Sequence, residues 1–254
     1  MIVYRKKLVR VAEAWFGEEP GAAGVDVVRC FQRDAPRDGA LSREFHTILI
    51  DLTREPGEIF ASMKQGCRYK IRRAVARDAL SYECANAAHA GMLARFCDLY
   101  DEFAPRKSLP PLDRAWLSLM AQTGCLYVSR VGDEASGEGL TWHTHYESHG
   151  RATLLHSASA PPPDDGDTSA RNRVGRANRF HHWRDMLWFK AAGATLYDLG
   201  GWYHGDSDAR RLGINRFKED FGGRVVKNYI TERAPTFRGR LFLRARQALL
   251  GDAI

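Results

Sequence analysis

The sequence predicts an α+β fold in which helices flank a mixed central sheet. Three observations lead to this prediction. Helical periodicity follows Pro56 and returns at 177–192, whereas the stretch 126–157 reads as three strands linked by glycine-containing turns. An apolar run at 194–199 carries Asp198 and is followed by two glycines. The chain has 254 residues, which is long enough to bury a substantial core.

Residues 1–55 are expected to form a short β-rich lobe. Strand-like runs occur at 1–11, 25–31 and 45–50, and Gly, Pro and Asp residues separate them. This pattern predicts a small sheet of three strands ahead of the first long helical segment.

The segment 56–235 is expected to form the main domain. Pro56 suits the first turn of a helix, and the residues that then lie near one face are Ile59, Met63, Cys67, Ile71 and Val75. The polar, proline-rich stretch 161–169 is expected to be a mobile loop. The other expected elements, in order, are helices at 88–104 and 112–123, strands at 126–131, 139–147 and 151–157, a helix at 177–192, a strand that ends at Asp198, a turn at Gly222 and Gly223, and a strand at 225–231.

Residues 236–254 are expected to form a basic C-terminal helix. The stretch TFRGRLFLRARQALL is amphipathic, so the helix could rest on an anionic membrane surface. A terminal helix that packs on its own domain is the commoner arrangement, and both readings stay open.

The charge of the chain favours anionic partners. Its formal net charge of +7 attracts nucleotides, coenzyme A, tRNA or lipid-linked diphosphates without choosing among them. No apolar run is long enough to span a bilayer, and charges interrupt any signal-peptide core near the amino terminus, so a cytoplasmic location is expected. Five cysteines without a Cys-x-x-Cys pair indicate neither a disulfide framework nor a structural zinc site.

The end of the predicted strand at 194–199 is the first candidate site. Glycines after Asp198 let the backbone approach a ligand without a Cβ in the way. The Asp198 carboxylate could orient or deprotonate an attacking amine, or it could cap a turn. Lys218, between Phe217 and Phe221 and beside a Gly-Gly turn, could present its ammonium to an oxyanion or phosphate, or be an ordinary surface lysine.

Two further groups of side chains are candidates. Arg68 and Arg72 share a helix face and could clamp a diphosphate, although a solvated basic face is the plainer reading. His143 and His145 share a strand face at a spacing that some metal sites use. A third ligand would have to come from His149, His156 or a carboxylate, and the sequence fixes none of them. No metal site is therefore predicted, and His143 is kept as a pocket residue and reserve general base.

Four short motifs resemble those of the Fem-type aminoacyltransferases (FemAB-like) within the GNAT acyltransferase superfamily, and they follow the order that they have in that family. They are RYKIRRA at 68–74, GRANRFHHW at 175–183, YDLGGW at 197–202 and FKEDFGG at 217–223. The resemblance implies a GNAT-type acyltransferase fold, and the predicted order of helices and strands matches such a domain. It also implies that Lys218 lies at the site of acyl transfer.

The segment Asn172–Ala177 resembles the loop with which GNAT enzymes hold the coenzyme A pyrophosphate on backbone amides. On that resemblance Gly175, Arg176 and Ala177 are expected to bind the donor. Asn172 stands where the pattern has Gln or Arg, which weakens the coenzyme A reading and keeps aminoacyl-tRNA as the other donor. The plain reading is a flexible basic loop that precedes a helix.

Together these features predict a transferase that moves an aminoacyl or acyl group from aminoacyl-tRNA or acyl-CoA to an amine on a small molecule, a sugar or a lipid-linked acceptor. No tightly bound cofactor is expected. Lys218 would stabilise the oxyanion and Asp198 would orient the amine. The expected substrate-binding residues are Arg68, Arg72, Trp202, Tyr203, Phe217 and His143. The alternative is a nucleic-acid-binding protein without catalysis.

Overall fold

The computed structural model describes residues 1–21, 23–89, 91–161 and 167–250 of the chain. The chain divides into two compact units. Unit 1 consists of Met1–Thr47 and Val226–Ile254, and unit 2 is Ile48–Val225. The assignment of functions to 1–55, 56–235 and 236–254 stays a prediction.

Unit 1 is a small sheet with one helix. The run predicted as a single strand at 1–11 is a hairpin, because the chain reverses at Lys7, whose φ of 55° lies in the left-handed region. The strands and helix of this unit are β1 (Ile2–Lys6), β2 (Val9–Trp15), β3 (Val27–Arg33), parts of β4 (Leu41–Asp51) and β10 (Arg224–Arg233), and α7 (Phe237–Leu250).

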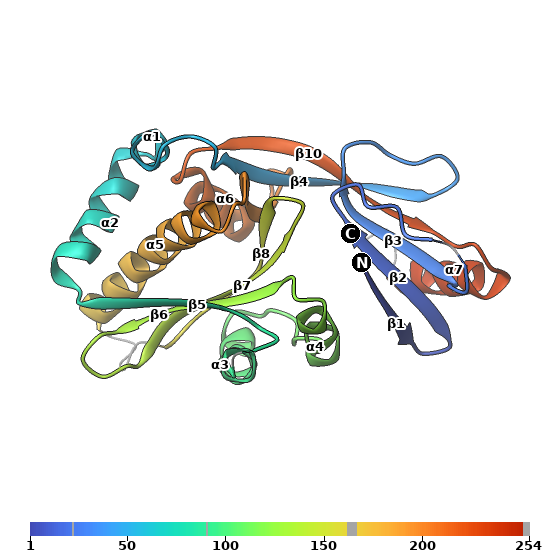
Figure 1. Cartoon of the computed structure of the whole chain (residues 1–254), viewed down its shortest axis with the longest axis horizontal. Helices are drawn as coiled ribbons and strands as arrows, with labels where there is room; N and C mark the ends of the chain where they lie inside the picture. The colour runs from blue at the N-terminus through green and yellow to red at the C-terminus, as the bar shows by residue number, and fades with distance from the viewer. Residues whose placement is uncertain (22, 90, 162–166, 251–254) are drawn as a thin grey trace. The chain divides into compact units, whose positions relative to one another are not determined.

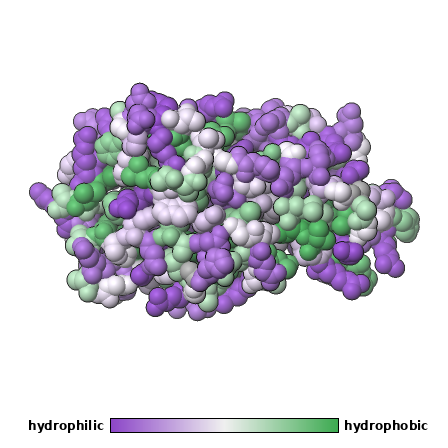
Figure 2. Space-filling view, in the orientation of Figure 1, coloured by the Kyte–Doolittle hydropathy of each residue, from purple (hydrophilic) through white to green (hydrophobic). Residues whose placement is uncertain are grey.

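Helix α7 confirms the predicted C-terminal helix over its described residues. Leu243 packs with Val9, Val11 and Val27 of the sheet, so part of the helix surface is used inside unit 1. Leu8 and Leu241 stay exposed and line a cavity of about 520 Å³ with basic neighbours. In the view of Figure 2, hydrophobic residues gather over the strands of this unit. Membrane contact through α7 stays a prediction.

Unit 2 is built on a mixed sheet with helices on both faces. Its strand order is β4-β9-β8-β7-β6-β5, and α2 and α5 lie on one face while α3 and α4 lie on the other (Figure 1). Its remaining elements are α1 (Pro56–Ser62), α2 (Gln65–Arg77), β5 (Leu80–Asn86), α3 (Met92–Arg106), α4 (Arg114–Gln122), β6 (Leu126–Asp133), β7 (Gly139–Ser148), β8 (Arg151–Ser159), α5 (Thr168–Ala191), β9 (Leu196–Trp202) and α6 (Ala209–Glu219).

The predicted α+β class and the antiparallel meander β6-β7-β8 are confirmed. Strands β8 and β9 pair in parallel, which α5 permits by crossing over between them. The core beneath α5 and α2 contains buried apolar side chains from the sheet and from α1, α2 and α5, among them Ile48, Ile59, Ile71, Phe189 and Leu199. No helix within the described residues combines the length and apolar character that a membrane crossing requires.

Several boundaries differ from the sequence predictions. The helix predicted from Pro56 is two helices, because Met63 and Lys64 adopt extended backbone conformations. Helix α5 begins at Thr168, where the Asp167 carboxylate accepts hydrogen bonds from the amides of Ser169 and Ala170. Residues 162–166 of the predicted loop lie outside the described residues. Strand β5 and helix α6 were not predicted.

Candidate functional site

The end of strand β9 is a close backbone crossing. Gly200 has a φ of 74°, and a Cβ there would lie 2.8 Å from the carbonyl oxygen of Leu154 on β8. Both the left-handed conformation and the close approach require glycine. Strand β9 continues through both glycines to Trp202, so the predicted strand end at Asp198 is wrong, and the glycines instead let β9 pass close to β8 where the candidate side chains meet.

Asp198 is fully buried next to these glycines. One carboxylate oxygen accepts hydrogen bonds from Arg151 at 2.6 Å and 3.1 Å and from the Thr153 hydroxyl at 3.2 Å. The other oxygen accepts the Gly200 amide at 2.7 Å. These contacts are those of the turn-capping alternative. An ion-paired carboxylate with both oxygens occupied is suited to fix the turn and not to remove a proton from an amine.

Lys218 lies in the last turn of α6, not in the turn that the sequence predicts. Helix α6 begins at Asp208, whose carboxylate caps the amides of Arg210 and Arg211. The Lys218 ammonium donates a hydrogen bond to the Gly201 carbonyl at 2.5 Å. Burial lowers the pKa of Lys218 to about 8, and the negative charge of Asp198 opposes that shift. The structure thus brings Lys218 to the end of β9.

The aromatic residues predicted to line the pocket connect β9 to α6. The Trp202 indole donates to Glu219 at 3.1 Å. The buried Asn215 side chain exchanges two hydrogen bonds with the backbone of Tyr203, at 2.9 Å and 2.7 Å. Phe217 packs on Phe221 with ring centroids 5.3 Å apart. Sequence reasoning missed Asn215, whose only signal is its place two residues before Phe217.

Arg68 and Arg72 have separate structural contacts on α2. Arg68 donates hydrogen bonds to the carbonyls of Ala61, at 2.8 Å, and Met63, and so caps the end of α1. The Arg72 guanidinium lies over the Phe60 ring, 5.3 Å from its centroid. A diphosphate clamp formed by the two arginines stays a prediction.

The segment Asn172–Ala177 lies inside α5, so the expected loop before a helix is wrong. Its backbone amides belong to the interior of a helix and are not presented as a phosphate-binding loop. Ala177 is fully buried, and Arg176 is paired with Asp78 at 2.7 Å and 2.8 Å. Gly175, Arg176 and Ala177 therefore lack the geometry on which their predicted role depended.

The same part of α5 faces α2 across a basic groove of about 680 Å³. The residues that line this groove are Tyr69, Lys70, Arg73, Thr168, Ser169, Arg171, Asn172, Gly175, Arg176 and Arg179. Arg176 and Arg179 are paired with acids. Within the described residues, Lys70, Arg73 and Arg171 form no ion pair. Arg179 also lies over the Phe217 ring, 4.7 Å from its centroid, so the groove borders the residue that precedes Lys218.

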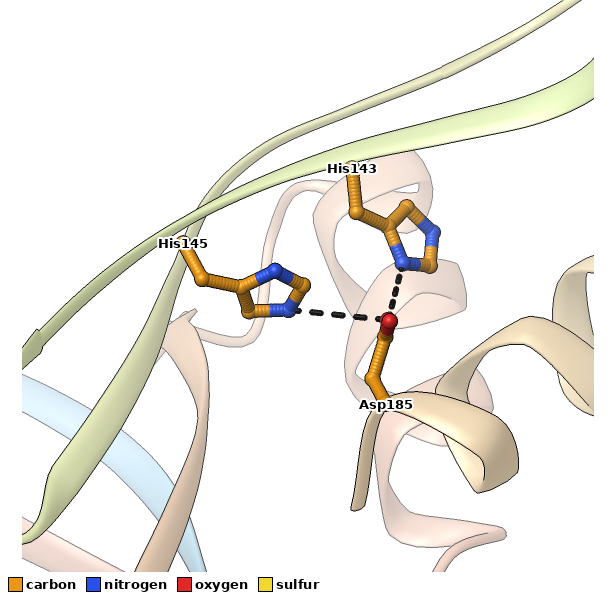
Figure 3. A group of neighbouring side chains, drawn as sticks. All are labelled: His143, His145 and Asp185. Carbon is orange, nitrogen blue, oxygen red and sulfur yellow. Dashed lines mark hydrogen bonds and ion pairs between the residues drawn. The ribbon is translucent and has the colours of Figure 1, made fainter. Parts of the chain in front are cut away.

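A second polar cluster is buried between β7 and α5. His143 and His145 lie on one face of β7, as predicted, and the carboxylate that joins them is Asp185 (Figure 3). The His143 ring bonds Asp185 at 2.7 Å and Asn178 at 3.3 Å. Because His143 is fully buried with both ring nitrogens engaged, it is not placed to line a substrate pocket or to act as a general base there.

Comparisons with known proteins identify the fold. No family model matches the chain, and no curated protein matches it in sequence. The solved structure of FemX is 14% identical, with a TM-score of 0.64 over 88% of this chain and 75% of that one. The C-terminal domain of a putative lysylphosphatidylglycerol synthetase from Agrobacterium fabrum is 15% identical, with a TM-score of 0.58 over 96% of this chain and 84% of that one.

A third structure, L-PGS from Bacillus licheniformis, is 14% identical, with a TM-score of 0.52 over 87% of this chain and 72% of that one. At such identities the likeness concerns the fold and not the substrate. The fold agrees with the one implied by the four sequence motifs. The chain therefore has the Fem-type, GNAT-like fold.

Proposed function

We propose that the chain is an N-acyltransferase that moves an aminoacyl or acyl group from an activated ester or thioester to an amine. The observation that supports this most is the Lys218 ammonium at the end of β9, 2.5 Å from the Gly201 carbonyl, in a chain with a Fem-type, GNAT-like fold. A cationic donor held at a strand end is suited to stabilise negative charge that develops on a bound substrate.

The proposed reaction needs no covalent enzyme intermediate. The nitrogen of a neutral amine forms a bond to the carbonyl carbon of the ester or thioester. The carbon–oxygen double bond of that carbonyl then becomes a single bond, and its oxygen becomes an oxyanion. The ammonium of Lys218 has three N–H donors and uses one on Gly201, so two are left for that oxyanion. Collapse re-forms the carbonyl and expels the alcohol or thiol, which takes up a proton as the nitrogen loses one.

Asp198 is a positioning residue in this proposal. Its carboxylate holds the Gly200 amide and so fixes the backbone that carries the Gly201 carbonyl. Its charge also opposes the fall in the pKa of Lys218, which favours the ammonium form that the reaction needs. We expect Asp198 to act through Lys218 without touching the substrate.

The basic groove supports a polyanionic donor. Three of its cations have no acidic partner among the described residues, and the groove adjoins Phe217 through Arg179. With Asn172–Ala177 inside a helix, no amide loop for a pyrophosphate exists in that segment. We therefore place aminoacyl-tRNA ahead of acyl-CoA as the donor, with an amine on a small molecule, sugar or lipid-linked acceptor.

The first test measures transfer. The purified chain is incubated with bulk aminoacyl-tRNA or with acetyl-CoA and a panel of amine acceptors, and amide formation is followed by mass spectrometry. Lys218→Met should reduce the rate by about 10²–10³-fold, as loss of an oxyanion donor does. Lys227→Met is the matched control, since Lys227 is an exposed lysine paired with Glu44 in unit 1. Equal rates for the two variants would contradict the proposed role of Lys218.

The groove also favours the alternative function, nucleic-acid binding without catalysis. Filter binding of charged tRNA at several salt concentrations tests the groove itself. The double variant Lys70→Ala with Arg73→Ala should weaken binding and reduce the slope of log affinity against log salt by roughly 1.5. The control replaces Arg95 and Lys107, two exposed residues outside the groove, and removes the same charge. Binding that depends on the groove, with no transfer to any acceptor, would favour the alternative.

A further inference from the structure

Among the described residues, the buried carboxylate of Asp185 faces no side chain that is always positively charged. Asp185 is fully buried, and its hydrogen-bond partners are the His143 ring at 2.7 Å and the Tyr82 and Tyr197 hydroxyls at 3.0 Å and 3.5 Å. Within the described residues, no lysine or arginine forms an ion pair with it. A buried carboxylate without a cation is costly, so the positive charge must come from a protonated imidazole or a bound ion.

The contacts of His143 sharpen that alternative. Its Nε2 lies 3.3 Å from the Asn178 side-chain amide. Its Nδ1 faces the Asp185 carboxylate at 2.7 Å. A lone pair pointed at a carboxylate is repulsive, so either a proton on Nδ1 or a metal ion bound to both atoms has to join the ring to the carboxylate.

The His145 ring faces the same carboxylate as the His143 ring. Its Nε2 faces the Asp185 carboxylate at 3.6 Å (Figure 3), and its buried Nδ1 has no hydrogen-bond partner among the described residues. No contact of Nδ1 therefore forces the proton onto Nε2, which can offer its lone pair.

The neighbouring His181 shows the contrast. It stacks on His143 with ring centroids 3.7 Å apart, but its two nitrogens bond the Ser129 and Thr141 hydroxyls, both at 2.8 Å. With both nitrogens bonded to hydroxyls, His181 is a packing residue of the cluster. The His143 Nδ1 and the His145 Nε2 both face the Oδ2 atom of Asp185, whereas the His181 Nε2 faces Oδ1 at 3.6 Å.

We propose that His143, His145 and Asp185 bind one divalent transition-metal ion, with Zn²⁺ as the ion to test. Their ligand atoms lie within 4.8 Å of one another. Two imidazole nitrogens and one carboxylate oxygen form a donor set that suits Zn²⁺ and its neighbours, at bond lengths of about 2.0–2.2 Å. The Tyr197 hydroxyl lies 3.0 Å from the His145 Nε2 and is a further oxygen beside these three side chains.

Binding exchanges a proton for the metal. The ion would form bonds to both imidazole nitrogens and to the carboxylate, and the proton that joins the His143 Nδ1 to Asp185 would leave Nδ1 for Nε2 or for solvent. No electron is transferred. Because all three side chains are fully buried, the ion would have a structural role. It would link strand β7, which carries the two histidines, to helix α5, which carries Asp185. This inference is independent of the proposed acyl transfer.

The test uses the full chain without a histidine tag, unfolded with a chelator and then refolded with or without ZnCl₂ and desalted. We expect about one zinc ion per wild-type chain by elemental analysis, because a structural site binds tightly once folded. Asp185→Asn and His145→Gln should each retain about ten-fold less zinc. His156→Gln is the control, since His156 is partly buried, lies on the adjacent strand β8 and bonds Thr144 at 3.0 Å.

Two readouts keep the test decisive where a variant fails to fold. Wild type refolded with zinc should melt several degrees higher than the metal-free chain, and Co²⁺ should give visible absorption bands that Zn²⁺ abolishes. The proposal is wrong if wild type refolded with zinc retains no more metal than His145→Gln and melts at the metal-free temperature. It is equally wrong if His156→Gln loses as much zinc as Asp185→Asn.

Discussion

Unit 2 contains two fully buried carboxylates that are balanced in different ways. Asp198 faces Arg151, a permanent cation, and both of its oxygens are occupied by donors of the surrounding backbone and side chains. Asp185 faces imidazoles and phenols, which have no permanent charge. Burial alone would raise the pKa of Asp185, but the surrounding histidines outweigh it and hold that pKa below the ordinary carboxyl value.

The two carboxylates therefore differ in whether their positively charged partner can be exchanged. The Arg151 guanidinium is a permanent cation, so its pair with Asp198 is a fixed part of this region of β9. A partner of Asp185 can gain or lose a proton, and the same space can then accept a metal ion. One carboxylate holds the backbone near Lys218, and the other is suited to an exchangeable cation.

The largest effect is expected for Asp198→Asn. This change removes the negative charge that faces the buried Arg151 guanidinium, and we expect the free energy of unfolding to fall by about 3–5 kcal/mol. In chelator, Asp185→Asn should cost only about 1–3 kcal/mol, because its histidine partners can become neutral and keep hydrogen bonds to the amide. Urea unfolding at pH 7 measures both values. Equal losses would remove the distinction between the two carboxylates.

Gly200→Ala tests the backbone that Asp198 holds. The new Cβ would meet the Leu154 carbonyl at 2.8 Å, and φ at 74° is strained for alanine, so we expect a loss of about 1–3 kcal/mol and slower acyl transfer. Gly193→Ala is the matched control, since its φ is 95° but nothing lies within 4 Å of the added Cβ. A transfer rate reduced equally by both changes would indicate general strain and not the close approach to β8.

The close approach of the backbone after Asp198 could be predicted from sequence because its signal is local, although the strand end predicted there was wrong, since β9 runs on to Trp202. Gly200 and Gly201 lie within three residues of Asp198, and glycines allow the backbone to come close to a neighbour. Helix α6, which carries Lys218, was missed because its sequence ARRLGINRFKE is polar and gives a weak apolar stripe. The structure places Lys218 in this helix, with its ammonium on the Gly201 carbonyl, and its role in acyl transfer stays a prediction.

The Asp185 cluster could not be completed from sequence for the opposite reason. His143 and His145 lie on one strand, but Asp185 comes from a helix 42 residues after His143, and only the crossing of α5 over β7 joins them. The early start of α5 did have a signal. Asp167 followed by Thr168 and Ser169 is a helix-capping pattern, and reading it would have placed Asn172–Ala177 inside the helix.

The pKa of Lys218 tests whether its ammonium is desolvated beside Asp198. In ¹³C spectra of the reductively methylated chain, we expect Lys218 to titrate near pH 8, as burial lowers its pKa to about that value. Assignment comes from the Lys218→Arg variant, and Lys227, whose pKa is raised by Glu44, is the internal reference. Acyl transfer should decline as pH rises above about 8, because the ammonium is lost. A Lys218 signal that titrates with the reference lysine would contradict its desolvation.

The same pKa predicts the sign of a stability change. The folded value of about 8 lies below the unfolded value of 10.5, so between these pH values the unfolded chain binds more protons than the folded one. Stability contributed by this group therefore rises with pH across that window. The difference in unfolding free energy between wild type and Lys218→Met should move in favour of wild type from pH 8 to pH 10, and a constant difference would exclude the shift.

The smallest effect is expected for Glu83→Gln, a third exchange of a carboxylate for an amide. Glu83 accepts from Arg130 at 2.8 Å across β5 and β6, a distance close to those of the buried pairs, but half of its side chain is exposed. Water can replace the lost partner, so we expect a change of about 0–1 kcal/mol that added salt reduces further. If Glu83→Gln cost as much as Asp198→Asn in urea unfolding, contact distance and not burial would set the cost of losing a counter-charge in this sheet.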